Sequence, residues 1–290
     1  MTSPLHLRAT KASGCIQSVH PDGVKDRCPN WAYVGFAVHI LAAGEMLSQS
    51  TDEREHMLVV ITGGMSLTVN GQPLGVFHRD NLFARQKAEG AYVPAQARWT
   101  LTATTDLEVA ICSAPGAPVT PDEPDNPDAP GRPARAFHAS GDVMEERGKG
   151  ANTRFVNAIA MEDTDIADSL LVTEVWTPQG NWSSYPPHKH DQDMFPAETY
   201  LEETYYHRLN PAQGYGYQRV YNDDLTLDEN IAFHDRDVVL VPEGYHPCGA
   251  PYGYDLYYLN VMAGPMRKWR FTNDPKHEWL FVRDGGVKPS

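Results

Sequence analysis

The chain consists of short, strand-prone runs in two stretches of similar length, with a proline-rich segment between them. Helical periodicity is scarce, and the runs are bounded by Gly, Pro, Asn and Asp. Residues 114–133 are dense in proline and acidic side chains, so they can form neither a helix nor a central strand and are predicted to be a linker or strap. Two such halves predict a duplicated all-β fold of two jelly-roll-like barrels.

The strand-prone runs set the expected boundaries. Strands of the first half are expected at residues 33–41, 56–61, 66–69, 91–93, 99–103 and 107–112, with Asn70-Gly71 as a tight turn. Strands of the second half are expected at residues 155–159, 170–176, 204–209, 216–221, 230–233, 238–241 and 256–262. The predicted divisions are a first barrel over 1–115, a linker over 116–136 and a second barrel over 137–290.

Three histidines and one glutamate of the second half have the spacing of a metal site. His188 and His190 are two residues apart, so on a strand they point to the same face and can reach one ion together. Glu203 opens a further strand-like run, and His246 follows a predicted strand and a Pro-Glu-Gly turn. Three imidazoles and a carboxylate suit Zn, Mn, Fe or Ni, and Zn is the first choice.

The first half lacks this ligand pattern. Arg98 stands where the second half has His246, at the same distance from a Val-Pro pair, and the first half contains no H-x-H. Its histidines have no partner at ligand spacing (for example His39, His56 and His78). The first barrel is therefore expected to be metal-free and structural.

Composition excludes several classes of partner. The net charge of -14 argues against nucleic acid and against an anionic membrane surface, both of which need concentrated Lys and Arg. No apolar run approaches the roughly 18 residues of a membrane span, and residues 1–14 lack a hydrophobic signal core. Four widely spaced cysteines without a C-x-x-C pair are expected to be free thiols. A cytoplasmic protein is expected.

Longer motifs carry a family resemblance. The stretches 181–191, 200–208, 218–221, 239–247 and 257–265 are similar to the 5-deoxyglucuronate isomerase family of inositol catabolism, whose members are bicupins. Residues 147–150 and 152–154 fit as well, and the first half fits more weakly through Trp31–Phe36. The resemblance covers nearly the whole chain. One departure is Cys248-Gly249, where the family more often has small aliphatic residues.

The resemblance implies an aldose–ketose isomerase that converts 5-deoxy-D-glucuronate into 5-dehydro-2-deoxy-D-gluconate. By position, it implies the metal ligands His188, His190, Glu203 and His246. Glu203 is chosen over Glu202 because the family places its acidic ligand directly before one residue and two aromatics. A related family of the pectin pathway acts on 4-deoxy-5-ketouronates, so that substrate is an alternative.

An isomerase of this kind needs a group that moves a proton between C2 and C1 and groups that stabilise the enediolate. The candidates for catalysis are Glu203, Tyr205 and Tyr258, and the residues alone do not decide among them or among other inward positions such as His207. Either Gln218 or Arg219 faces inward, and Asn260 shares a face with Tyr258. The candidates for substrate binding are Arg154, Lys149, Gln218, Arg219 and Asn260.

Two other functions fit the same metal motif. A cupin dioxygenase would use Fe(II) and O₂ with a similar ligand set, because one fold serves many chemistries. A non-catalytic sugar-binding bicupin is the other, although such a protein has no need of a complete ligand set. The extended motifs favour the isomerase. A small uronate is the expected substrate, and a homo-oligomer is expected because barrel edges need covering.

Overall fold

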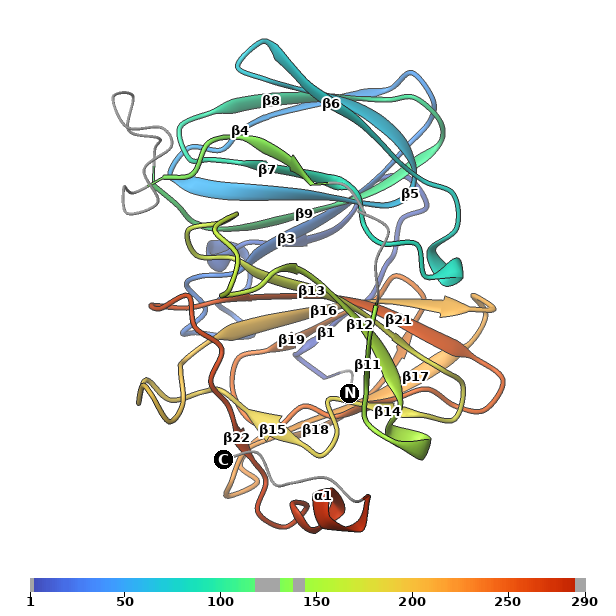
Figure 1. The fold of residues 1–290 in the computed structure, drawn as a ribbon, viewed down its shortest axis with the longest axis vertical. Helices are drawn as coiled ribbons and strands as arrows, with labels where there is room; N and C mark the ends of the chain where they lie inside the picture. The colour runs from blue at the N-terminus through green and yellow to red at the C-terminus, as the bar shows by residue number, and fades with distance from the viewer. Residues whose placement is uncertain (1–2, 118–130, 138–143, 285–290) are drawn as a thin grey trace.

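Antiparallel strands form nearly all the regular structure of the computed structural model, which describes residues 3–117, 131–137 and 144–284. Two β-rich bodies lie one above the other, the first half of the chain above and most of the second half below (Figure 1). The predicted all-β fold with two barrels is confirmed. None of the helices in the described ranges is long and apolar enough to cross a membrane.

The first barrel is a nine-stranded sheet organised around one long strand, Arg54–Val69. The first part of this strand pairs with β7 and β9, and its last part pairs with β6 and β8, so two expected strands are in fact one. Asn70 and Gly71 have φ of 50° and 77° and close the hairpin to β6, as predicted. The strands are β2 (Gly14–Val19), β3 (Gly35–Leu41), β4 (Met46–Ser50), β5 (Arg54–Val69), β6 (Gln72–Arg79), β7 (Gly90–Val93), β8 (Arg98–Ala103), β9 (Leu107–Pro115) and β10 (Arg135–Phe137).

The second barrel combines a seven-stranded sheet, a four-stranded sheet and a two-stranded ribbon. The seven-stranded sheet contains β1 (His6–Leu7), β11 (Glu145–Arg147), β12 (Arg154–Ala160), β13 (Leu171–Thr177), β16 (Glu202–Asn210), β19 (Val238–Val241) and β21 (Asp255–Ala263). The four-stranded sheet contains β14 (Trp182–Ser183), β17 (Tyr215–Tyr221), β18 (Asp228–His234) and β20 (Cys248–Gly249). The ribbon pairs β15 (His188–Lys189) with β22 (Thr272–Asn273), and the helical turns are η1 (Pro21–Gly23), η2 (Leu82–Ala84), η3 (Gly150–Asn152) and α1 (Trp279–Arg283).

Short strands cross between the two halves. Strand β1, near the N-terminus, pairs with β19 at the edge of the second sheet. Strand β10, which follows the proline-rich stretch, pairs with β7 at the edge of the first sheet. Most of the predicted linker, residues 118–130, lies outside the described residues. The first half therefore adds a strand to the second sheet, and the end of the predicted linker adds one to the first sheet.

The two barrels have the same strand register. His56 on β5 lies opposite Val93 and Ser113, and Glu203 on β16 lies opposite Val241 and Met262. The predicted duplication is therefore visible residue by residue, but the interiors differ. Side chains that fill the first barrel are mainly apolar, and they include Leu58, Val60, Phe77, Trp99 and Leu101.

One detail of the expected correspondence needs correction. Arg98 has the sequence position of His246, but its side chain is exposed, whereas His246 is buried. Trp99, fully buried, occupies the inward place, and its Nε1 donates a hydrogen bond to His56 Nδ1 at 3.0 Å. A shift of one residue on a strand turns the side chain to the other face, and sequence spacing does not reveal such a shift.

Buried carboxylates join the barrels. Glu202 of the second barrel accepts hydrogen bonds from the backbone N–H groups of Ala32, Tyr33 and Val34, at 2.5, 2.8 and 2.9 Å. Glu55 holds the equivalent place in the first barrel and accepts from the N–H groups of residues 168–170. Each carboxylate binds three backbone donors of the opposite half, and those of Val34 and Leu170 are buried and would otherwise have no partner.

A buried ion pair makes the same connection through side chains. Arg79 Nη2 donates to both carboxylate oxygens of Glu174 at 2.9 Å, and both side chains are fully buried. Glu174 also accepts from Tyr257 and Asn157. Arg79 lies on β6 and Glu174 on β13, so the pair spans the interface between the barrels.

We predict that Arg79→Met lowers the free energy of unfolding by about 3–5 kcal/mol, because it leaves the Glu174 carboxylate buried without its cation. Chemical denaturation measures the change. The matched control is Arg135→Met, which removes an exposed pair with Asp165 and is expected to cost about 0–1 kcal/mol. Equal losses for the two variants would contradict the interface role of the buried pair.

Candidate metal centre

The ribbon β15–β22 presents two histidines to the mouth of the second barrel. His188 and His190 point to one side, with ring centroids 6.1 Å apart. The intervening Lys189 points the other way, where its Nζ donates to Asp223 at 2.5 Å. The alternation of a strand therefore brings both imidazoles to one place, as their spacing predicts.

Strand β16 supplies the carboxylate. Glu203 points into the barrel and is 2 % exposed, whereas its neighbour Glu202 points toward the first barrel and binds backbone there. Strand parity thus separates the two acids that compete for the ligand role. Asn260 on β21 lies opposite Tyr205 and donates through Nδ2 to Glu203 Oε1. Glu203 Oε2 is left to face the histidines.

Backbone carbonyls fix the tautomers of two imidazoles. His246 Nδ1 lies 2.8 Å from the carbonyl oxygen of Gly244, and His190 Nδ1 lies 3.1 Å from that of Leu201. A carbonyl oxygen only accepts, so each Nδ1 carries a proton, and in the neutral imidazole each Nε2 therefore has a free electron pair. Gly244 reaches its position with φ of 85°, a conformation that suits glycine.

These free electron pairs converge on one point. Glu203 Oε2 lies 3.1 Å from His190 Nε2 and 3.0 Å from His246 Nε2, and the buried His246 Nε2 has no hydrogen-bond donor among the described residues. The ligand atoms of His188, His190 and His246 all lie within 4.8 Å of one another. Electron pairs that face one another in a buried site need a cation between them. The donor set suits a divalent metal ion with nitrogen and oxygen ligands.

The protonation states follow from these contacts. Burial opposes ionisation of both Glu203 and His190, but without a metal ion a hydrogen bond between them, with the proton on the imidazole, lowers the pKa of the Glu203 carboxyl and raises the pKa of His190. A metal ion would take the place of that proton. Burial, together with the other two imidazoles, holds the pKa of His188 well below its ordinary value. The carboxylate is therefore charged and His188 is neutral at neutral pH, the states in which both bind metals.

Two tyrosines line the chamber beside Glu203. The Tyr205 hydroxyl lies 2.8 Å from Ser184 Oγ, and the Tyr258 hydroxyl lies 2.6 Å from Ser183 Oγ. Burial, reinforced by nearby acidic groups, raises the pKa of both phenols above the ordinary value. The phenols therefore remain protonated and act as hydrogen-bond donors.

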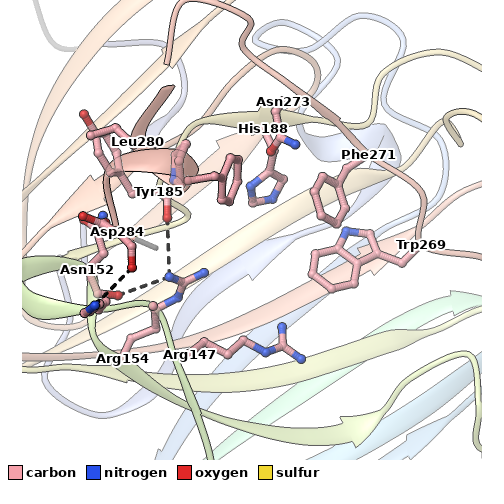
Figure 2. Close-up of a pocket in the computed structure, with 14 residues that line it drawn as sticks. Arg147, Asn152, Arg154, Tyr185, His188, Trp269, Phe271, Asn273, Leu280 and Asp284 are labelled. Carbon is pink, nitrogen blue, oxygen red and sulfur yellow. Dashed lines mark hydrogen bonds between the residues drawn. The ribbon is translucent and has the colours of Figure 1, made fainter. Parts of the chain in front are cut away.

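A cavity leads from solvent to the histidines. An outer chamber of about 490 Å³ opens beside His188, and an inner chamber of about 50 Å³ continues to Glu203. Figure 2 shows Arg147 and Arg154 along one side of the outer chamber and Trp269 with Phe271 along another. Both arginines line both chambers, so a molecule beside His188 or Glu203 has two cations in the same cavity.

The other predicted site residues fall in different places. Asn260 lines the inner chamber, and Lys149 lines the outer one, where its Nζ donates to the Asp284 carbonyl at 3.2 Å. Gln218 faces inward, is 1 % exposed and pairs with His207 at 3.0 Å. Arg219 does not share the chamber: it lies on the opposite face of β17 and pairs with Asp228 at 2.6 and 2.8 Å.

Some cavity residues were not predicted from the sequence. Arg147 belongs to a motif run that we singled out, yet only the β11–β12 pairing shows that its side chain reaches both chambers. Trp269, Phe271 and Leu280 line the outer chamber and come from the C-terminal segment, which runs along the second barrel to β22 and α1 (Figure 1). No local sequence pattern predicts that this segment lines the cavity, because its position depends on the path of the whole C-terminal chain.

We predict that His246→Ala abolishes stoichiometric metal binding, because it removes a ligand whose orientation the Gly244 carbonyl fixes. Elemental analysis of purified protein by mass spectrometry measures the metal content. The control is His234→Ala, which removes a histidine at the end of β18 whose ring is 57 % exposed. Full metal content in His246→Ala would show that the ligand assignment is wrong.

Comparisons with known proteins agree with this architecture. The model of the KduI/IolB family matches residues 7–280. The chain is 46% identical over 270 residues to a 5-deoxy-glucuronate isomerase of Geobacillus kaustophilus. The aligned region covers 92% of this chain and 91% of the relative. A protein of the same name from Bacillus subtilis is 42% identical over 252 residues, 87% of this chain and 89% of the relative.

Solved structures show the same fold. An IolB-like protein from Salmonella typhimurium superposes with a TM-score of 0.86 at 45% identity, over 95% of this chain and 98% of the other. Oxalate decarboxylase of Lactobacillus farciminis superposes with a TM-score of 0.64 at 12% identity, over 97% and 91%, and therefore shares the bicupin fold alone. The matched length and the identity together show that this chain belongs to the KduI/IolB family.

Proposed function

We propose that this protein is an aldose–ketose isomerase that converts 5-deoxy-D-glucuronate into 5-dehydro-2-deoxy-D-gluconate. The observation that carries the proposal is the cluster of three histidines with Glu203, which the arginine-lined cavity reaches at His188 and Glu203. Relatives with the name 5-deoxy-glucuronate isomerase match over most of the chain. The arginine-lined cavity and the family membership both support a small uronate as substrate.

The arginines would bind the carboxylate of the substrate. Arg154 Nη1 donates to backbone carbonyls of Asn152 and Tyr185, at 3.1 and 3.4 Å, and none of the described carboxylates forms an ion pair with it. Burial lowers the pKa of Arg154 somewhat, but a guanidinium remains charged at neutral pH. The Arg154 guanidinium is planar and charged, it is fixed by two backbone carbonyls, and it lines the cavity. These properties suit it to bind a carboxylate.

The inner chamber would carry out the proton transfer. A divalent ion on His188, His190, His246 and Glu203 would act as a Lewis acid that makes the C2 proton more acidic. Among the described residues that line this chamber, Glu203 is the only carboxylate, so we assign it the transfer of the proton from C2 to C1. The protonated phenols of Tyr205 and Tyr258 would donate hydrogen bonds to the enediolate oxygens, and Asn260 would orient Glu203.

We also propose zinc as the resident metal, a role in inositol catabolism, a cytoplasmic location and a homo-oligomeric state. Zinc suits a centre with three imidazoles and one carboxylate. All four cysteines are free thiols, as expected in a reducing compartment. Large exposed side chains, including Tyr252 at 88% and Tyr217 at 51%, lie on the second barrel and favour contact with another copy. Elemental analysis and light scattering test the metal and the oligomer.

Oxygen dependence separates the isomerase from a dioxygenase. We expect purified, metal-loaded protein to convert 5-deoxy-D-glucuronate to the ketose under anaerobic conditions, because isomerisation moves a proton and needs no oxidant. Product formation is followed by nuclear magnetic resonance. A requirement for O₂, or its stoichiometric consumption, would contradict the proposal.

Arg154→Met is expected to raise KM and lower kcat/KM by about tenfold to hundredfold, because it removes a charged hydrogen bond to the substrate carboxylate. The metal content should not change, since Arg154 is not a ligand. Arg219→Met is the control, because that side chain points away from the chamber. Equal effects of the two substitutions would refute the assignment of Arg154.

A further inference from the structure

The first barrel has a cavity of its own. It encloses about 460 Å³ at the mouth of the barrel, between β3, β9 and the start of β5. Its inner wall contains Ala37, Arg54, His56, Ile111 and Ser113. These residues take no part in the metal centre or in its cavity.

This cavity is the register equivalent of the metal chamber. The cross-strand pairs of the two barrels match His56 with Glu203, Ser113 with Met262, Ile111 with Asn260 and Ala37 with Thr173. All four residues of the second barrel line its inner chamber, and all four of the first barrel line this cavity. The first barrel therefore has a cavity at the place of the metal chamber, but other side chains line it.

His56 aims a hydrogen-bond donor into the cavity. Trp99 Nε1 donates to His56 Nδ1 at 3.0 Å, and an indole N–H can only donate, so the proton of the imidazole is on Nε2. The side chain is 93% buried, since His56 is 7% exposed, yet Nε2 has no partner among the described residues. Burial and the nearby charge of Arg54 lower the pKa of His56 to about 4, so the ring is neutral.

Arg54 contributes a cation beside this donor. Its Nε donates to Ser113 Oγ at 3.2 Å, and its Nη2 donates to the carbonyls of Tyr33 and Ser113 at 2.5 and 3.0 Å. These bonds fix the guanidinium, while Nη1 has no partner among the described residues. Gly35 leaves room here, because a side chain at this position would meet Ser113 and Arg54. The Arg54 guanidinium is therefore fixed through Nε and Nη2, and its Nη1 can donate a hydrogen bond to a ligand.

The rim of the cavity has a different chemistry. Gln49, Ser50, Asp52 and Glu53 line it, and Ser50 Oγ donates to Asp52 Oδ1 at 2.7 Å. Carboxamide, hydroxyl and carboxylate groups bind sugar-type hydroxyls. The two acidic residues of the rim would repel a dianionic phosphate, whereas a hydroxy acid can place its single negative charge at the donors of the bottom and its hydroxyls at the rim.

We propose that this cavity is a second small-molecule site, which binds a hydroxy acid with its carboxylate against Arg54 Nη1 and His56 Nε2 and its hydroxyls toward the rim. A metal ion is disfavoured here, because Trp99 occupies the imidazole electron pair and Arg54 supplies the positive charge. The site is independent of the proposed isomerase activity. It gives the first barrel a binding role in addition to its structural one.

Fluorine nuclear magnetic resonance tests the proposal at the site itself. The full-length, metal-loaded protein is labelled with 5-fluorotryptophan, which reports on its six tryptophans. Trp99→Phe assigns the resonance of Trp99, which is hydrogen-bonded to His56. Titration with D-gluconate is expected to shift this resonance in a saturable way, whereas sodium chloride at equal ionic strength leaves it unchanged.

Matched variants separate this site from the second barrel. Ala37→Leu fills the cavity without removing a hydrogen bond, and Arg54→Met removes the cation; each is expected to weaken gluconate binding about tenfold or more. Arg154→Met changes the other cavity and should leave the Trp99 titration unchanged. No saturable shift of the Trp99 resonance, or the same shift in folded Ala37→Leu protein, would overturn the proposal. Thermal melts confirm that the variants are folded.

Discussion

The second barrel is organised around one buried carboxylate oxygen. Glu203 Oε2 lies 3.1 Å from Nε2 of His190 and 3.0 Å from Nε2 of His246, and these nitrogens repel it when they are unprotonated and no cation is present. The carbonyls of Leu201 and Gly244 hold the rings so that neither nitrogen can turn its proton toward the oxygen. This arrangement is unfavourable without a cation, so the need for a cation explains the polar interior of an otherwise apolar fold.

The same strand register gives the two barrels opposite interiors. In the second barrel the inward positions of β16 hold Glu203, Tyr205 and His207, and in the first barrel the equivalent stretch of β5 begins with His56 and continues with Leu58 and Val60. Apolar packing stabilises the first interior without a ligand. Buried acids such as Glu55 and Glu202 join the two barrels through hydrogen bonds to backbone N–H groups of the opposite half.

The alternation of side chains along a strand explains why the sequence could predict the histidine pair of the candidate metal centre. His188 and His190 share a face because they are two residues apart on a strand, and this holds wherever the strand lies. The strand Val238–Val241 was predicted from a different signal, a short run of consecutive apolar residues that is typical of a strand buried on both faces. By contrast, β4 (Met46–Ser50) is an exposed strand without an apolar face, so no pattern marked it.

Side-chain orientations and cavity walls that depend on the pairing of distant strands could not be predicted from the sequence. The inward choice of Gln218 over Arg219 is set by the pairing of β17 with β18 and β20. The one-residue shift that turns Trp99 inward in place of Arg98 follows from the pairing of β8 with β5. The cavity walls contributed by Trp269 and Phe271 require the whole C-terminal path, which only the tertiary structure shows.

The central claim is that one cation at Glu203 and the three histidines makes the second barrel an isomerase. Stepwise addition of zinc to chelator-treated protein, with turnover of 5-deoxy-D-glucuronate recorded at each step, tests it most directly. Activity should rise linearly and reach a plateau at one ion per chain, and Glu203→Gln should show no such rise. Full activity in metal-free protein, or a plateau only at two ions per chain, would contradict the account.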